Sequence, residues 1–385
     1  MRAALECFRS SKVTDLTRNN AKLTIGDRLD AHRGSTNGFD YLRITLAVGV
    51  IGWHSVFTSY GFQYESGVYA SWIRAIVQPI LPMFFVLGGF LVAGSLFRTG
   101  SFSEYLLLRA LRFFPALLAV VSLSALVLGP LLTTCGLSTY FTSAEFFAYF
   151  LNVFAYFKAE LPGVFQDNPG PGVVNVSLWT IPWEFGCSIA LYAVMFCREG
   201  LRSKALLAVT IIALIAIPTV LVALGRGPLL HKRPPGHLLA LCFMVGTCFY
   251  VYRHKIPSSF SLFISCLALS FLFFSGVRSA YFAIIPVAYV TVYLGVLHPP
   301  KYGFMKRADL SYGIYLYGCV VQQTLMWSFP AARVWWINWT ISTMLASLCA
   351  FWSWRLIEGP ILRSKKQIIA RLIGSNNQPV KVGVR

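Results

Sequence analysis

The sequence has few charged residues. Asp, Glu, Lys and Arg together make up 12% of its 385 positions, whereas a soluble domain of this length would carry about a quarter. Hydrophobic residues make up 56%, and apolar stretches long enough to cross a bilayer recur along most of the chain. This composition excludes an ordinary soluble enzyme and a disordered chain. It predicts an all-α polytopic membrane protein with a bundle of about ten transmembrane helices.

The nine cysteines lack any metal-binding or redox pattern. The chain contains no C-x-x-C pair and no Cys/His spacing of the kind that binds zinc. Most of the cysteines fall inside apolar stretches, where a free cysteine behaves as a small hydrophobic residue. We therefore predict no metal site.

Acidic residues are the scarcer charge, with 14 Asp and Glu against 33 Lys and Arg and a formal net charge of +19. A groove for single-stranded nucleic acid would need basic runs interleaved with aromatic residues, and the sequence has none. Basic residues of membrane proteins collect in cytoplasmic loops and tails. We therefore expect the lipid bilayer as a partner and no nucleic acid.

Ten apolar stretches fit transmembrane helices, although the sixth is short. They are residues 40–61, 76–97, 112–132, 177–197, 205–224, 237–252, 259–276, 280–297, 311–329 and 334–357. With the N-terminus inside, the segments expected on the inner side carry 25 Lys and Arg, and those expected outside carry 7. This bias predicts that both termini are cytoplasmic.

The predicted membrane domain lies between two cytosolic tails and contains one large outer loop. The N-terminal tail, the membrane domain and the C-terminal tail are residues 1–39, 40–360 and 361–385. Within the outer loop at 133–176, residues 144–157 are strongly apolar, but this stretch is too short to cross a bilayer comfortably. We predict an interfacial or re-entrant helix there. Residues 160–175 are rich in Pro and Gly and cannot be helical throughout.

Ionisable side chains inside a bilayer are costly, so each one needs a reason. Arg43 and His54 share one face of the first span, because eleven residues make three helical turns plus about 20°. Asp40 is one turn before Arg43 and near enough to pair with it. His54 is then about 21 Å from the inner surface, and Glu184 in the fourth span about 10 Å below the outer surface. In a core about 30 Å thick these depths coincide, so His54 and Glu184 are predicted to lie at one level.

A second level of charge is predicted near the inner surface. Arg109 and Arg112 lie three residues apart at the start of the third span, where both can face one groove and a helix N-terminus favours anions. Together with Arg43 they could bind phosphates, about 15–20 Å from a histidine suited to general-base work. An acyl-coenzyme A, with phosphates at one end of a long arm, fits this spacing. Alternatively, the arginines are topology signals and the histidine bonds a neighbouring helix.

Five local patterns recur in order from Gly38 to Pro360. They are GFDYLRITLAVGVIGWHS (38–55), FFVLGGFLVAG (84–94), RALRFFPA (109–116), SLWTIPWEF (177–185), and SYGIYLYG (311–318) with WRLIEGPI (354–361). In these patterns the chain resembles the acyltransferase 3 family of integral-membrane O-acyltransferases. The resemblance implies about ten helices, a multi-pass protein of the bacterial inner membrane, and an essential role for His54. It also implies acyl-CoA, expected to be acetyl-CoA, as a donor substrate with no permanently bound cofactor, and a carbohydrate hydroxyl as the acceptor.

We therefore predict an enzyme that moves an acyl group from acyl-CoA to a hydroxyl of a cell-surface or secreted carbohydrate. Arg109 and Arg112, helped by Arg43, would hold the donor phosphates. His54 would either deprotonate the acceptor hydroxyl or take the acyl group transiently. Glu184 would orient His54 or stabilise its protonated form.

The fourth span also carries two tryptophans. Trp179 and Trp183 would pack the sugar rings of the acceptor, or else anchor the span at the interface. Two other classes of function stay open. In a secondary transporter or an exporter of a lipid-linked glycan, Arg43 and Glu184 would be a permeation pair, but the sequence shows no internal repeat. A multipass scaffold without chemistry would not need His54 and Glu184 at one depth.

Overall fold

The computed structural model describes residues 23–99, 101–195, 199–223, 234–276, 279–303 and 308–373. Every regular element in this part of the chain is a helix, which confirms the predicted all-α class. The first half contains α2 (Ile25–Ala31), α3 (Gly38–Tyr60), α4 (Phe62–Tyr69), α5 (Arg74–Val77), α6 (Ile80–Leu96), α7 (Phe102–Leu123), η1 (Ser124–Leu128), α8 (Gly129–Leu132), α9 (Leu137–Thr142), α10 (Ala144–Tyr149), η2 (Phe150–Phe154), η3 (Val176–Thr180) and α11 (Ile181–Met195). The second half contains α12 (Glu199–Ala223), α13 (Gly236–Val251), α14 (Phe260–Ser275), α15 (Ile284–Gly295), α16 (Ser311–Ser328), η5 (Pro330–Ala332), α17 (Trp335–Ser353), η6 (Trp354–Glu358), α18 (Gly359–Arg363) and α19 (Lys365–Ile373).

Several of these helices have the composition of membrane segments. Two helical stretches of the described chain, Arg74–Leu96 and Ser103–Leu132, are long and apolar enough to cross a membrane, and shorter apolar helices accompany them. Each of the ten predicted spans coincides with a helix or a run of consecutive helices. These features fit a membrane protein, while the number of crossings stays a prediction.

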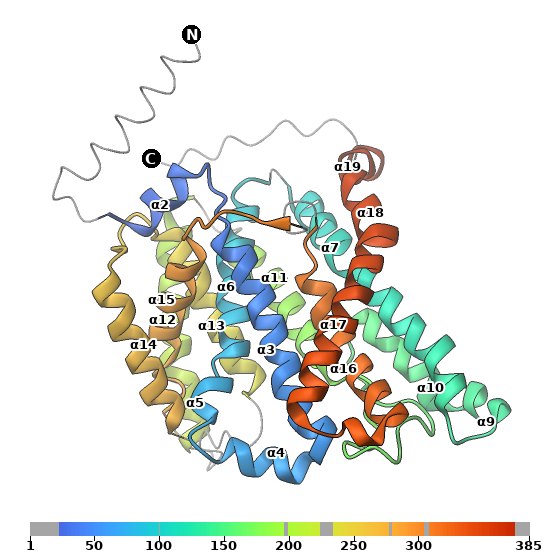
Figure 1. Ribbon diagram of the computed structural model, residues 1–385. Coiled ribbons are helices and arrows are strands. Elements are labelled where there is room, and N and C mark those ends of the chain that lie inside the picture. Colours follow the sequence, from blue (N-terminus) through green and yellow to red (C-terminus); the bar gives the residue numbers. More distant parts are fainter. Residues whose placement is uncertain are drawn as a thin grey trace.

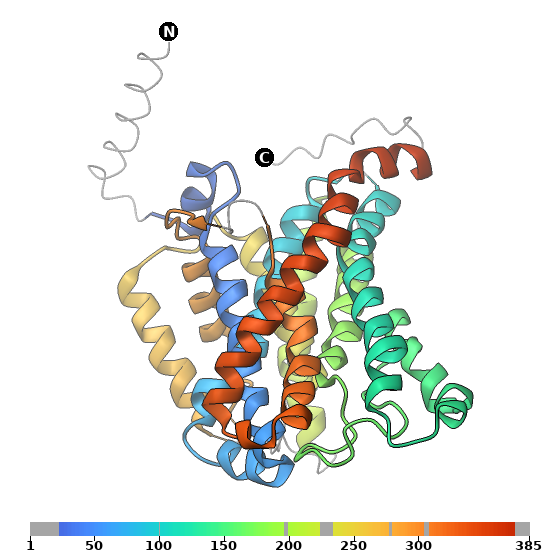
Figure 2. The same cartoon turned by 45° about the vertical axis from the view of Figure 1, so that its right-hand side comes forward.

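The helices form one bundle with two distinct ends. α2 and α19 lie at one end and α4 at the other (Figure 1), and we call these the α2 end and the α4 end. α3 runs between them and packs against α16 and α17, while α6 packs against α13. In the turned view, α7 leans away from the rest of the bundle and leads to α9 and α10 (Figure 2).

The crossing of α6 and α13 depends on glycine. A Cβ on Gly89 would lie 2.0 Å from the carbonyl oxygen of Phe243, and a Cβ on Gly246 would lie 2.1 Å from that of Val86. Because no side chain fits these spaces, the two backbones can approach closely, as small residues allow in membrane helix pairs. The hydroxyl of Thr247 donates to the Gly89 carbonyl at 3.2 Å. This contact fixes α6, which lines both cavities described below.

Two π-helical turns occur directly before Gly–Pro pairs. η1 precedes Gly129 and Pro130, and η6 precedes the pair at 359–360. The Gly129 N–H donates five residues back to Ser124, and Pro130 has no N–H to serve the next carbonyl, Ala125. The buried hydroxyl of Tyr140 donates to that carbonyl instead, at 2.8 Å. Proline thus sets the position of the π-turn, and α9 completes its hydrogen bonds.

The predicted outer loop has the expected mixture of short helices and irregular chain. Its apolar part forms α10 and η2, only eleven residues from Ala144 to Phe154. Residues 155–175 contain no helix, as their Pro and Gly content predicts. Buried Gln323 on α16 holds this stretch in place. Its amide donates to the carbonyls of Gly170 and Val173 at 2.8 and 2.7 Å, and its oxygen accepts from Asn168 at 2.8 Å.

Parts of both predicted tails pack onto the bundle, which the sequence analysis did not foresee. α2 begins at a capping box of Thr24 and Asp27 and buries Ile25 and Leu29 on one face. The Ile25 N–H donates to the Ile256 carbonyl at 2.9 Å. At the other terminus, α19 packs against α7. The apolar residues of α2 and the contact of α19 therefore extend the folded domain beyond residues 40–360.

Candidate active site

A cavity of about 700 Å³ lies among α3, α6, α7, α11 and α16. We call it the basic cavity, because its lining includes five Lys and Arg side chains: Arg43, Arg98, Arg109, Arg112 and Lys365. Arg98 and Lys365 are exposed and form its rim, and Lys365 is the first residue of α19, which lies at the α2 end. Its volume is in the range of sites that bind small molecules and cofactors.

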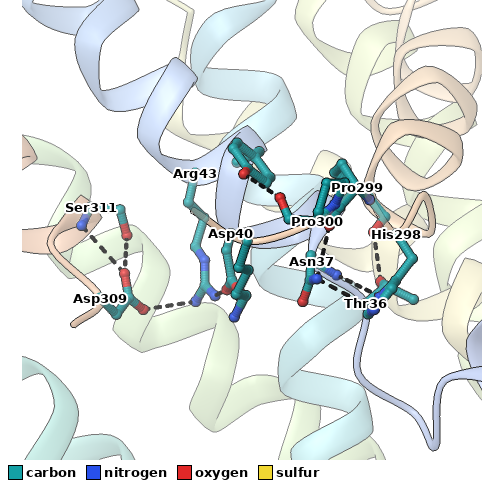
Figure 3. A network of polar contacts seen from close by, with 12 residues as sticks. Thr36, Asn37, Asp40, Arg43, His298, Pro299, Pro300, Asp309 and Ser311 are labelled. Carbon is teal, nitrogen blue, oxygen red and sulfur yellow. Dashed lines mark hydrogen bonds and ion pairs between the residues drawn. The ribbon is translucent and has the colours of Figure 1, made fainter. Parts of the chain in front are cut away.

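Two of these arginines share one carboxylate. Asp309, which lies just before α16, contacts Arg43 at 3.3 Å and Arg112 at 2.7 Å. Arg43 also pairs with Asp40, as predicted from their spacing, and Asp40 pairs in turn with Lys301. Figure 3 shows Arg43 between the two carboxylates, Asp40 and Asp309. The network joins the start of α3 to α7 and to the chain before α16.

Asp309 stays charged because of its neighbours. Burial alone would raise its pKa, but the Arg112 and Arg43 guanidiniums and the hydrogen bonds from Ser311 hold the pKa of this carboxyl well below its usual range. The Ser311 hydroxyl donates to it at 2.6 Å (Figure 3). Two positive charges of the cavity are therefore partly neutralised by a fixed negative charge.

Arg109 is in a different position. Within the described residues it makes no ion pair, and neither do Arg98 and Lys365. Tyr105 and Glu184 are close enough to act on its charge. Counting only described residues, the cavity thus contains three cationic side chains without an ion-paired carboxylate, one inside and two at its rim.

The structure corrects the expected start of the third span. α7 begins at Phe102, and the Ser101 hydroxyl caps it by accepting from the Glu104 N–H at 3.2 Å. Arg109 and Arg112 are therefore inside the helix and not at its N-terminus. Because the partial charge of a helix end falls off within the first turn, the helix N-terminus cannot contribute to anion binding there. The guanidinium groups alone can provide that attraction.

His54 lies in a second, smaller cavity of about 50 Å³, which we call the histidine cavity. Aromatic residues form much of its wall: Trp53, Phe57, Tyr69, Trp179 and Tyr315. The His54 ring meets the edge of Phe57 with ring centres 5.5 Å apart. Glu65 and Gln78 add polar groups, and no Lys or Arg is among the described residues that line it.

Leu81 and Tyr315 line both cavities and separate them. The Tyr315 hydroxyl is fixed by the Thr180 hydroxyl at 2.7 Å and donates to the Ser177 carbonyl at 3.0 Å. Its ring meets Phe84 edge-on, with centres 5.6 Å apart. The two cavities therefore share part of their walls at these two side chains.

The structure brings together some of the predicted site residues and separates others. Arg43, Arg109 and Arg112 line one cavity, at the level where the sequence analysis grouped them. Glu184 lies in the same basic cavity, near Arg109 and Arg112. His54 lines the other cavity, and Glu184 is not among the residues that line it. The predicted pairing of these two residues stays a prediction.

The two predicted acceptor residues also differ in position. Trp179 lines the histidine cavity. Trp183 is 40% exposed and packs over Gly236, where an added Cβ would lie 1.9 Å from its indole ring. Only Trp179 is therefore placed to contact a molecule near His54.

The sequence analysis did not select several residues of this region: Lys365 of the basic cavity, Gln78 and Tyr69 of the histidine cavity, and Asp309, which pairs with two arginines of the basic cavity. For Asp309 a signal was available. It is one of only 14 acidic residues and directly precedes the SYGIYLYG pattern. Tyr69 lies in the connection between the first two predicted spans and Gln78 near the start of the second, and composition alone gives no reason to select either.

Comparisons with known proteins show the family of this chain. The acyltransferase 3 family model, described as an acyltransferase domain, matches residues 36–357. Nodulation protein 10 of Rhizobium leguminosarum bv. viciae is 27% identical over 370 residues, which cover 88% of this chain and 96% of the relative. An O-acetyl transferase of Shigella phage Sf6 is 25% identical over 345 residues, which cover 84% of this chain and 95% of the relative. No solved structure matches the chain.

Proposed function

The chain belongs to the acyltransferase 3 family and is an acyltransferase, and from this premise we propose that it moves an acyl group from acyl-CoA to a carbohydrate hydroxyl. The acyl group is expected to be acetyl, and the carbohydrate to be at the cell surface or secreted. One observation carries the proposal. A large basic cavity and a small cavity with a histidine meet at Leu81 and Tyr315.

The charges of the basic cavity favour a donor with several phosphates. Arg98, Arg109 and Lys365 have no carboxylate partner among the described residues, so a diphosphate can pair with them without displacing one. A single guanidinium group can bind two oxygens of one phosphate at once. Arg43 and Arg112 already share Asp309, and we assign them the role of fixing the cavity wall. This revises the sequence-based hypothesis, in which Arg109 and Arg112, helped by Arg43, hold the donor phosphates.

Glu184, Thr180 and Tyr315 also line the basic cavity, and Tyr315 is part of the wall shared with the histidine cavity. The phosphates of the donor stay with the cationic side chains, while the uncharged pantetheine arm extends toward this shared wall. The thioester at the end of that arm is then brought toward His54.

His54 provides the chemistry of transfer. As a general base it accepts the proton of the acceptor hydroxyl, while the hydroxyl oxygen attacks the thioester carbonyl carbon. The new C–O bond forms, the C–S bond breaks, and the thiolate of coenzyme A takes the proton from His54. The alternative route, in which His54 first accepts the acyl group, uses the same residue as a nucleophile. A labelled acyl-histidine in protein incubated with donor alone would identify that route.

We also propose that the basic cavity faces the cytoplasm, where acyl-CoA is made, with both termini on that side. The support is the excess of Lys and Arg in the segments predicted to be inside, 25 against 7 in those predicted outside. Reporter fusions ending at Ser203 and Asn168 are expected to report inside and outside, respectively. The same side for both would refute this orientation.

The function itself can be tested with the glycans of the cell. Surface polysaccharide is purified from a strain that carries the gene and from its deletion mutant, and O-linked acyl groups are measured by NMR. We expect ester in the first sample, its loss in the second, and its return with the wild-type gene but not with the His54→Ala variant. Equal ester content in all four samples would contradict the proposal.

A further inference from the structure

Two buried polar side chains of the histidine cavity have no hydrogen-bond partner in the part of the chain that the structure describes. Gln78 is 2% exposed, and neither its amide nitrogen nor its amide oxygen is bonded to any described residue. Tyr69 is 3% exposed, and its hydroxyl is likewise without a partner in the described chain. Both line the cavity that contains His54. Most buried polar groups in proteins are paired, because leaving one unpaired costs about 1–3 kcal/mol.

Both side chains are attached to a firmly held part of the backbone. Tyr69 is the last residue of α4, and its ring packs on Trp53 with centres 5.6 Å apart. Gln78 directly follows α5. α5 is anchored by the buried Arg74, which donates to the carbonyls of Phe274 and Ser275 at the end of α14. The unpaired amide and hydroxyl groups are therefore held in fixed positions in the cavity wall.

The chemistry of these groups indicates what could complete them. A glutamine amide offers two donors and one acceptor oxygen, and a tyrosine hydroxyl can donate or accept. Burial raises the pKa of Tyr69, so its hydroxyl keeps the proton needed to donate. Sugar hydroxyls also donate and accept, whereas a phosphate would find no Lys or Arg in the described lining. The flat faces of Trp53 and Trp179 suit the C–H edges of a sugar.

We propose that Gln78 and Tyr69 bind hydroxyl groups of the carbohydrate acceptor and hold the reacting hydroxyl beside His54. This inference rests on the proposed transfer to carbohydrate and adds the residues that select and position the acceptor. The cavity of about 50 Å³ has room for a few water molecules or for one edge of a sugar, and not for a whole ring. The site therefore recognises a hydroxyl-bearing edge presented to it, while the rest of the glycan stays outside.

The test separates acceptor binding from donor binding. The purified protein is given radiolabelled acetyl-CoA and surface polysaccharide that has been de-esterified with mild alkali. KM for the polysaccharide and kcat are measured for Gln78→Leu, Tyr69→Phe and the double variant, and the Kd for acetyl-CoA is measured by calorimetry. Loss of one hydrogen bond to a neutral group is expected to raise the acceptor KM about 3- to 10-fold in each single variant, with an unchanged donor Kd.

A matched control is available in Tyr140→Phe. This variant also removes a buried tyrosine hydroxyl, but one that bonds to the Ala125 carbonyl, far from His54 in the chain and outside both cavity linings. Its acceptor KM should equal that of the wild type, even if the protein is less stable.

The possible results are distinct. If the wild type transfers label and all Gln78 and Tyr69 variants keep the wild-type acceptor KM, ordered water alone occupies these groups and the inference is overturned. If the wild type binds acetyl-CoA but labels no polysaccharide, the proposed function fails and the inference fails with it. A raised KM in Tyr140→Phe equal to that in Tyr69→Phe would also refute it, because the effect would then come from general destabilisation.

Discussion

The two cavities of this acyltransferase differ most in charge. Five Lys and Arg side chains line the basic cavity, and none is among the described residues that line the histidine cavity. The positive charge of the basic cavity is suited to an anionic donor, which arrives from water and must be attracted and held. Polar groups without Lys or Arg, together with aromatic faces, are suited to a carbohydrate, which is recognised by hydrogen bonds and shape. Under the proposed function, each cavity serves one substrate, and the reaction occurs where they meet.

Removing the histidine is expected to have the largest effect on transfer. We expect His54→Ala to lower transfer of labelled acetyl from acetyl-CoA to polysaccharide by about 10²-fold or more, because general-base catalysis is lost. Donor affinity should stay unchanged, since His54 does not line the basic cavity. His254→Ala is the matched control, because His254 lies near Asp30 at the α2 end. Near-normal transfer by folded His54→Ala protein would remove His54 from the mechanism.

Replacing Asp309 tests whether its negative charge stabilises the wall of the basic cavity. Its carboxylate is 27% exposed and pairs with Arg43 and Arg112. Asp309→Asn is expected to lower the free energy of unfolding by about 2 kcal/mol, less than the 3–5 kcal/mol for a fully buried pair.

The pH dependence of this effect has a definite sign. Because the pKa of Asp309 is held below its unfolded value of 3.8, its stabilisation is fully present above about pH 4 and is lost as the pH falls further. Thermal unfolding of the two proteins in detergent should therefore differ at pH 7 and converge below pH 4. Equal melting temperatures at pH 7 would show that the ion pairs do not stabilise the fold.

Lysine substitutions at Arg109 and Arg112 test which arginines of the cavity bind the donor. Arg109→Lys should weaken acetyl-CoA binding about tenfold, because lysine cannot form the paired contacts of a guanidinium. Arg112→Lys should weaken it less, since Arg112 is already engaged by Asp309. Calorimetry on both purified variants gives the comparison, and the reporter fusions check insertion. An unchanged donor affinity in both would leave these arginines as topology signals.

The smallest predicted effect concerns the two tryptophans of the fourth span. Trp179→Ala should raise the acceptor KM about fivefold, because it removes an aromatic face from the histidine cavity. Trp183→Ala should leave the acceptor KM unchanged, since Trp183 packs on Gly236 and is partly exposed. Similar acceptor KM values for both variants would contradict the prediction that only Trp179 contacts the acceptor.

The sequence predicted the positions of the helices well. The ten apolar stretches coincide with helices because hydrophobic length is a local property. The pairing of Asp40 with Arg43 was equally accessible, since residues three apart on a helix are neighbours. The irregular stretch at 155–175 followed from its Pro and Gly content.

The contacts between distant helices could not be predicted in the same way. Helical rise gives the depth of His54 and Glu184 along the bundle, but not the direction that each side chain faces. The two therefore share a predicted level and still line different cavities. The start of α7 was placed too late because residues 102–111 contain Glu104 and Arg109, which an apolar window rejects and a helix accommodates.

Gln323 also limits how the loop near the α4 end can change over evolutionary time. Its amide is bonded to Asn168, Gly170 and Val173 at once. Adding or deleting one residue among positions 168–173 would draw a carbonyl away from the amide and leave buried groups unpaired. Two of the three bonds go to backbone carbonyls, which every type of residue carries. This segment is therefore expected to vary by substitution between descendants, while its length is inherited unchanged.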